Sequence, residues 1–196
     1  MQAPFFDSQS PKYLNYGGIG SVIGHEITHG FDDQGRTYDK DGKFFRDDEV
    51  GLWTNATVEQ YKQRASCIIN QYSSYNATQV NMNLNGYQTQ GENIADNGGI
   101  KESFGAYQKW AKQNGPEQLL PGLEKYSQTQ LFFINYAQVW CAKFRDASLK
   151  SRILTGVHSP GPFRIQGPTS NFVEFSKAFN CKPKQANNPD NKCSVW

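Results

Sequence analysis

Hydrophobic residues recur at roughly helical spacing in the middle of the chain, between residues 92 and 113. Such a recurrence predicts a helix with one buried face. Gly115 and Pro116 follow, a pair that ends helices. The residues that define the buried face are Ile94, Ile100, Phe104, Tyr107 and Trp110.

The rest of the pattern predicts further helices separated by polar segments. An apolar run from Leu131 to Ile134, followed by Val139 and Trp140, predicts a buried helix over 127–145. Other predicted helices cover about 21–31, 49–72 and, more briefly, 171–179. The opening to about residue 16 is expected to be irregular, and the Asn-rich stretch 73–90 is a loop or short strands. The predicted class is mainly α with little β structure.

Composition limits the class of protein. The 196 residues are 37% hydrophobic and 14% aromatic, which is typical of a globular chain with one core, so we expect a single domain over 1–196. The net charge is +2 and no basic stripe is present, which argues against nucleic acid as a partner. No apolar run reaches the roughly 20 residues that span a bilayer. The first four residues do not resemble a signal peptide.

Cysteines and glycosylation sequons bear on the compartment. The four cysteines form no C-x-x-C pair, which argues against a cysteine-ligated metal, and they allow three disulfide pairings. Asn55 and Asn76 each begin an N-x-T sequon. Together these features favour an extracellular location.

One short motif carries candidate chemistry. His25 and His29 flank Glu26 in the pattern H-E-x-x-H. Residues four apart share a helix face, so both imidazoles can reach one zinc ion, and Glu26 can take a proton from a water molecule that the metal activates. The alternative is a surface helix that carries this pentapeptide by chance.

A catalytic zinc usually has a third protein ligand, and two glutamates compete for that role. Glu49 follows His29 at a spacing similar to that of thermolysin, but it also fits an ordinary acidic helix start. Glu92 has Asp96 four residues further on, so one carboxylate could bind zinc while the other accepts a hydrogen bond from a ligand imidazole. We therefore favour Glu92.

Several blocks together resemble the neprilysin and endothelin-converting-enzyme family of zinc peptidases, whose catalytic domain is of the thermolysin-like (gluzincin) type. They follow the order of that family and extend over nearly the whole chain. The blocks are residues 22–33, 91–99, 135–141, 158–161 with 163–164, and 193–196.

The resemblance implies roles for individual residues. Zinc would be bound by His25, His29 and Glu92, with Glu26 as general base. Asp96 would orient a ligand histidine, most plausibly His25. His158 would stabilise the oxyanion of the tetrahedral intermediate, and Arg164 would hydrogen-bond a substrate carbonyl. The residues that match the family's apolar substrate pocket are Phe5, Val22, Val139 and Trp140.

The resemblance also implies a disulfide between Cys67 and Cys193. By the same resemblance, Cys141 and Cys181 match positions whose partners lie in the family's N-terminal lobe, and we expect that lobe and the family's membrane anchor to lie outside this sequence. Without that lobe, we expect apolar faces around Val139, Trp140 and Phe133 to be exposed.

The implied activity is a zinc endopeptidase that cleaves extracellular oligopeptides on the amino side of hydrophobic residues. The alternative is a truncated fragment that binds zinc or peptide without turnover.

Two positions depart from the family pattern. Gly156 stands where an Asp is usual, which predicts that a tether of the His158 loop is missing. Ser21 replaces a common Met, which predicts a wider or more polar pocket.

Overall fold

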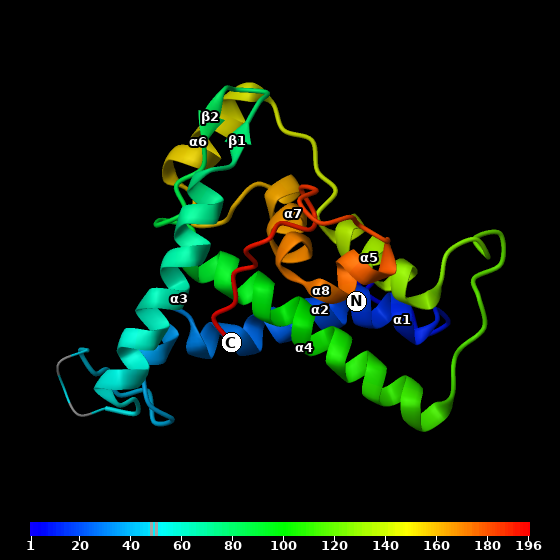
Figure 1. Ribbon diagram of the computed structural model, residues 1–196, viewed down its shortest axis with the longest axis horizontal. Coiled ribbons are helices and arrows are strands. Elements are labelled where there is room, and N and C mark those ends of the chain that lie inside the picture. Colours follow the sequence, from blue (N-terminus) through cyan, green and yellow to red (C-terminus); the bar gives the residue numbers. More distant parts are fainter. Residues whose placement is uncertain (48, 50) are drawn as a thin grey trace.

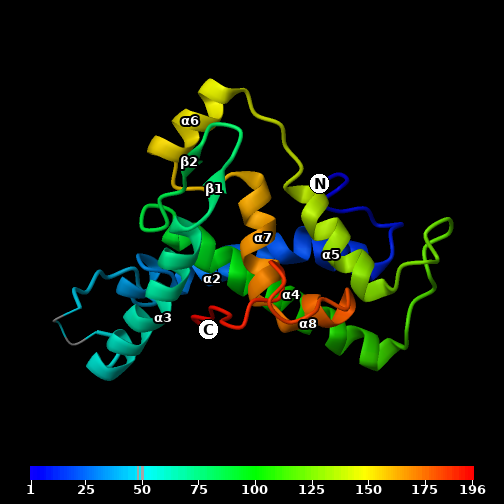
Figure 2. The same ribbon diagram turned by 45° about the horizontal axis from the view of Figure 1, so that its top comes forward.

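The computed structural model describes residues 1–47, 49 and 51–196. Helices dominate, as the sequence predicts, and the longest, α4 (Gln90–Asn114), crosses the molecule beside α2 (Ser21–Thr28) (Figures 1 and 2). A hairpin of β1 (Asn76–Ala77) and β2 (Met82–Asn83) projects beside α6 (Asp146–Thr155). The remaining helices are α1 (Lys12–Asn15), α3 (Asn55–Ser73), α5 (Gln128–Val139), α7 (Gly161–Asn171) and α8 (Val173–Ala178). No helix in the described residues has the length and hydrophobicity to cross a membrane.

The segment before the H-E-x-x-H motif is more regular than predicted. The expected irregular opening contains α1, and a π-helical turn over Tyr16–Gly20 leads directly into α2. The α-helix ends at Thr28, and a 3-10 turn continues it over His29–Phe31, so the predicted helix 21–31 is present with a tighter last turn.

Two predicted helices are shorter in the structure. The predicted helix 49–72 begins only at Asn55, because the Thr54 hydroxyl accepts a hydrogen bond from Thr57 N (3.2 Å). Of its predicted start, Glu49 lies outside the helix and residue 50 lies outside the described residues. The helix predicted over 127–145 starts with a capping box of Ser127 and Gln130 but ends at Val139.

Besides the short α1, the helices α6 and α7 were missed by the sequence pattern. The α7 sequence contains two Gly and two Pro residues, which favour loops. Pro162 lies in its first turn, where proline is tolerated. Gly167 packs against the ring of Tyr72 so closely that a Cβ would overlap it. Burial against α3 therefore outweighs the weak helical propensity of this segment.

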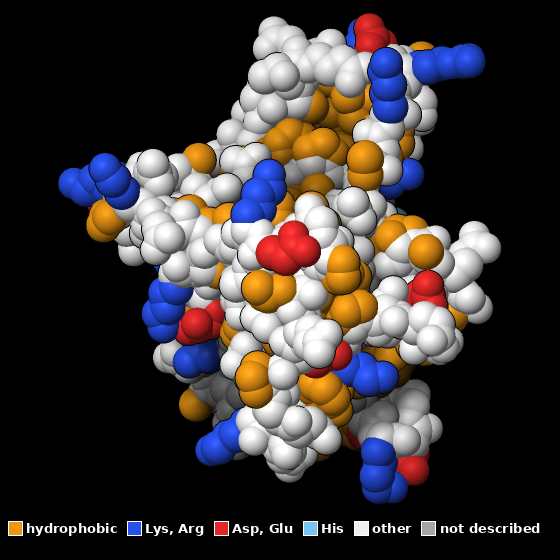
Figure 3. Space-filling view, turned by 90° about the vertical axis from the view of Figure 1, so that its right-hand side faces the viewer, with side chains coloured by type: hydrophobic (Ala, Val, Ile, Leu, Met, Phe, Trp, Pro, Cys, Tyr) orange, Lys and Arg blue, Asp and Glu red, His pale blue; other side chains and the backbone are white. Residues whose placement is uncertain are grey.

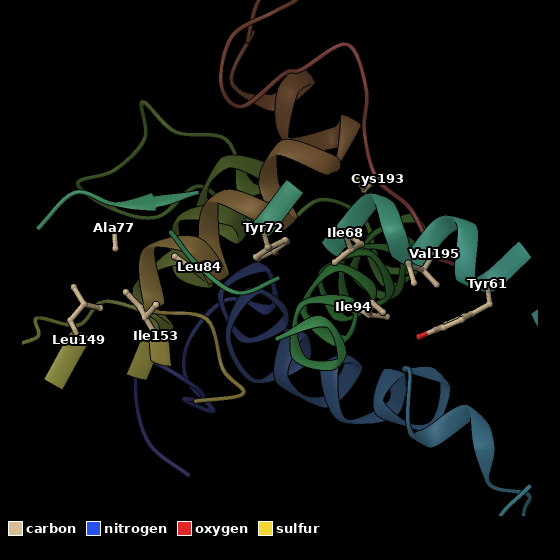
Figure 4. Packing of buried hydrophobic residues seen from close by; sticks show 11 residues of the cluster. Tyr61, Ile68, Tyr72, Ala77, Leu84, Ile94, Leu149, Ile153, Cys193 and Val195 are labelled. Atoms are coloured by element: carbon tan, nitrogen blue, oxygen red, sulfur yellow. The ribbon is translucent and has the colours of Figure 1, made fainter. Parts of the chain in front are cut away.

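Two hydrophobic clusters form the core. One joins α3, α4, α6 and the C-terminal segment around Ile68, Tyr72 and Ile94, as Figure 4 shows. The other surrounds Phe132 and Phe133, and Phe133 is only 1% exposed. The prediction that Phe133 belongs to an exposed apolar face is therefore wrong. Its ring packs against those of Phe104, Phe172, Phe175 and Phe179.

The disulfide implied by the resemblance is confirmed. Cys67 on α3 is bonded to Cys193, 126 residues further along the chain, and both lie against the first core cluster. The bond fixes the C-terminal segment onto α3. Cys141 and Cys181 are not disulfide-bonded.

Glycines set the distance between α2 and α4. A Cβ at Gly24 would lie 2.8 Å from the carbonyl oxygen of Gly99 and 2.9 Å from its Cα. A Cβ at Gly99 would overlap the backbone nitrogen of His25 and lie 2.6 Å from the carbonyl oxygen of Ser21. Real Cβ atoms do not approach other atoms so closely, so this packing requires glycine at both positions.

Gly99→Ala should therefore destabilise the protein and displace His25, which the sequence predicts as a zinc ligand, so that any zinc held there would bind more weakly. The added methyl group would push α2 away from α4 at His25, and overpacking costs about 1–3 kcal/mol. Gly105→Ala on the same helix is the matched control, because nothing lies within 4 Å of its added Cβ. It should be neutral or stabilise by up to about 1 kcal/mol. Denaturant unfolding and a competitive zinc titration measure both effects, and equal results for the two variants would contradict this account.

Candidate metal centre

Three side chains from two helices converge on one point. His25 and His29 lie one turn apart on the α2 segment, and Glu92 lies in the first turn of α4. The Nε2 atoms of the histidines are 2.9 Å apart, and they lie 3.3 and 3.5 Å from the Glu92 carboxylate oxygens. One potential ligand atom from each residue lies within 4.8 Å of the others. This is the spacing of atoms that share one metal ion.

A second carboxylate holds each imidazole. His25 Nδ1 donates to Asp96 Oδ1 (2.8 Å), and His29 Nδ1 donates to Asp32 Oδ2 (2.7 Å). Since both carboxylates accept hydrogen bonds, the Nδ1 atoms carry the protons, and when both imidazoles are neutral their Nε2 lone pairs face each other. Asp32 is fixed in turn by the backbone amides of Gln34 and Gly35.

The sequence prediction included Asp96 but not Asp32. Asp32 follows His29 by three residues, a spacing that could have indicated a contact between them. The 3-10 turn that ends the helix is what brings the carboxylate of Asp32 to the imidazole of His29.

The convergent atoms fit a cation. Two Nε2 lone pairs and the carboxylate of Glu92 are all acceptors, and Glu92 Oε2 is buried with no hydrogen-bond partner in the described part of the chain. Two imidazoles and one carboxylate form a donor set that zinc commonly takes in catalytic sites. The residues present therefore fit zinc.

Electrostatics favour a positive charge at this point. Burial lowers the pKa of His25, but its hydrogen bond to Asp96 and the nearby carboxylate of Glu92 (3.3 Å) outweigh burial and raise it to about 9. Burial raises the pKa of Glu92, yet the nearby imidazole of His25 and the charge of His158 bring it below its usual value. Without metal the site therefore retains a proton at neutral pH, and metal binding releases it.

Arg164 is tied into the same network. Its Nε and Nη2 donate to the two oxygens of Asp96 at 2.7 and 2.8 Å, and its guanidinium lies 3.8 Å above the Trp140 ring. Nη2 also lies 3.5 Å from Glu92 Oε2. Arg164 is only 7% exposed, so it is not a surface charge.

His158 reaches the site from the loop after α6. Its Nε2 lies 3.1 Å from Glu92 Oε1, and about half of its side chain is exposed. The loop is anchored on both sides: Gln88 Nε2 donates to the Gly156 carbonyl (2.8 Å), and Ser159 Oγ donates to Asn93 Oδ1 (2.8 Å). Gln88 therefore provides a tether beside the position where the family pattern predicts a lost one.

Glu26 lies on the exposed side of α2, next to His25. Within the described residues it has no hydrogen-bond or ion-pair partner. An unpartnered carboxylate adjacent to a metal ligand is available to a water molecule or a substrate.

A cavity of about 370 Å³ opens beside His158 and Arg164. Two of the four predicted pocket residues, Val139 and Trp140, line it, whereas Phe5 and Val22 do not. Phe5 is 38% exposed. Ser21 is buried and its hydroxyl donates to Tyr16 O (3.3 Å), so it does not line this cavity.

Comparisons with known proteins agree with this geometry. Residues 1–195 match the family model described as "Peptidase family M13". The chain belongs to peptidase family M13. It is 53% identical to Neprilysin-2 of Drosophila melanogaster, 49% identical to human Neprilysin and 50% identical to mouse Endothelin-converting enzyme 1, each over the whole chain.

The fold is also similar to that of solved zinc metalloprotease structures. The chain superimposes on Mycobacterium tuberculosis zinc metalloprotease Zmp1 in complex with an inhibitor with a TM-score of 0.90 and 36% identity. That match covers 100% of this chain and 29% of the other. Against the three relatives above, the chain spans 24–26% of their length.

Two other predictions concern exposed residues of this M13 chain. Glu49 is exposed, interacts with Arg46 and lies outside the metal cluster, so the structure does not bring it to the histidines. Asn55 and Asn76 of the two sequons are both exposed. Asn76 donates to Asn83 across the hairpin (2.8 Å).

Glu92→Gln should lose most of the bound zinc, because an amide oxygen without negative charge replaces one of three ligands. Glu49→Gln removes the same charge outside the cluster and should keep full stoichiometry. Elemental analysis of the purified, dialysed proteins distinguishes them. Loss of the metal from Glu49→Gln with retention by Glu92→Gln would reverse the assignment.

Proposed function

We propose that this protein is a zinc-dependent endopeptidase that hydrolyses extracellular oligopeptides. The observation that supports it best is the convergence of His25, His29 and Glu92, with each imidazole held by its own carboxylate. Membership of a peptidase family supports the same conclusion.

Zinc held by these three residues would supply Lewis-acid chemistry, polarising the scissile carbonyl and making water acidic. Glu26 is the general base: it takes a proton from the attacking water and later delivers it to the leaving amine. Its lack of an ion-pair partner among the described residues leaves its carboxylate free for both transfers.

Arg164 and His158 act on the substrate. Asp96 takes the hydrogen bonds of Arg164 Nε and Nη2, which fixes the guanidinium and leaves Nη1 to donate to a peptide carbonyl. His158 lines the same cavity as Arg164 and donates to the oxyanion as negative charge develops there.

The cavity beside these residues sets the specificity. Val139 and Trp140 give it an apolar wall, which suits a hydrophobic side chain on the carboxyl side of the cleaved bond. The Cys67–Cys193 disulfide supports an extracellular location, and Asn55 and Asn76 are exposed for glycosylation. In the whole protein, an N-terminal lobe would be the partner of this segment and an N-terminal anchor its link to the membrane.

A second candidate is a segment that binds zinc and peptide without turnover. It is favoured by the exposure of Ile23 (53%) and Ile27 (58%), which flank Glu26 on α2 and leave this face of the site without a covering element in the described residues.

Glu26→Gln should keep its zinc but lose about 10²–10⁴-fold in kcat, because Glu26 is a base and not a ligand. Glu59→Gln, an exposed acid on α3, is the control and should leave kcat unchanged. A fluorogenic peptide assay with and without chelator, together with zinc analysis, measures this. If the unmodified protein holds zinc but shows no chelator-sensitive hydrolysis, the second candidate holds instead.

His158→Ala should lower kcat by about 10²–10³-fold with little change in KM, as expected when one oxyanion donor is removed. Steady-state kinetics over a range of substrate concentrations separate the two constants. An unchanged kcat with a raised KM would make His158 a group that binds the ground state.

A further inference from the structure

The cavity beside the metal centre is lined by one positively charged residue, Arg152, to which the proposed chemistry gives no role. Its lining includes three side chains that carry or can carry positive charge, Arg152, His158 and Arg164, and no acidic residue of the described chain. Figure 3 shows hydrophobic side chains gathered in the upper part of the face that includes the connection from α5 to α6. The wall is therefore apolar with basic groups set into it.

The two arginines are in different electrostatic situations. Arg164 is buried and neutralised by the two-point contact with Asp96. Arg152 is exposed, and in the part of the chain that the structure describes it has no carboxylate within ion-pair distance. Its guanidinium instead lies 5.1 Å above the ring of Phe144, another residue of the cavity wall.

In this position the guanidinium of Arg152 is free to bind a carboxylate. A guanidinium matches a carboxylate with two parallel hydrogen bonds, and stacking on an aromatic ring holds its plane while leaving its edge free. A basic residue in the last turn of a helix also stabilises that helix. Lys150 on the same helix is exposed and does not line the cavity, so its substitution is a control for the loss of a positive charge from this helix.

We propose that Arg152 is a specificity-determining residue that binds a carboxylate of the peptide substrate next to the hydrophobic residue in the cavity. The carboxylate is either the free C-terminus of a short peptide or an acidic side chain. This inference rests on the proposed function, since it assumes that the cavity receives the part of the peptide beyond the cleaved bond.

Binding of intact peptides tests it in the natural full-length chain, loaded with zinc and carrying Glu26→Gln to prevent cleavage. Two peptide pairs share one hydrophobic residue. In the first pair a free C-terminal carboxylate is compared with an amide, and in the second, with both C-termini amidated, Asp is compared with Asn. Isothermal titration gives the ratio of Kd values within each pair, and the pair that shows the preference identifies the source of the carboxylate.

With Arg152 present, the acidic member of at least one pair should bind about 10-fold more tightly, the effect of one charged hydrogen-bonded contact at an exposed site. Arg152→Met should abolish that ratio, Arg152→Lys should retain part of it, and Lys150→Met should leave it unchanged. No preference in the parent protein, the same preference in Arg152→Met, or failure to bind either pair would overturn the proposal. Cleavage of the neutral amidated peptide by the protein with Glu26 intact reports separately on the proposed function.

Discussion

The close contact between α2 and α4 is the constraint on which the metal centre depends. Gly24 and Gly99 allow the two backbones to meet without intervening side chains, and Gly98 makes room for the side chain of Thr28. The contact places the first turns of α4 opposite the last turn of α2, so Glu92 and Asp96 face His25. Since interiors are close-packed and transmit strain, one added methyl group at this contact would be felt at the metal ligands.

The charge network built on this contact links the candidate metal ligands to the cavity proposed to receive substrate. Asp96 is 2% exposed and accepts hydrogen bonds from both His25 and Arg164. Burial raises the pKa of Asp96, but Arg164 and His25 outweigh it, so this carboxyl stays ionised. A buried ion pair is weak evidence for stability, because the desolvation of two charges offsets their attraction. Its clearer consequence is orientation: one carboxylate fixes both a metal ligand and the guanidinium that faces the substrate cavity.

The sequence predicted the parts of the site that are set by helical spacing. His25 with His29, and Glu92 with Asp96, each lie four residues apart, and the structure brings the two pairs together. It did not predict Asp32, because that carboxylate reaches His29 only through a 3-10 turn. Similarly, α7 escaped prediction because its Gly and Pro residues favour loops until tertiary packing buries them. For Phe133 the apolar run 131–134 correctly predicted burial, whereas the expectation of an exposed face without an N-terminal lobe was wrong, because aromatic rings of this same chain cover it.

The assignment of Arg152 depends wholly on tertiary structure. Its sequence context is that of an ordinary basic residue near a helix end, and only the position of Phe144 and the cavity distinguishes it from Lys150.

X-ray absorption at the zinc edge tests the central claim most directly, because it reports the ligand atoms without requiring activity. For the zinc-loaded protein the account predicts two imidazole nitrogens at about 2.0–2.1 Å and carboxylate or water oxygen at a similar distance, with no sulfur. A sulfur scatterer at about 2.3 Å would show that a cysteine holds the metal. A shell with fewer than two imidazoles would equally contradict the site formed where α2 meets α4.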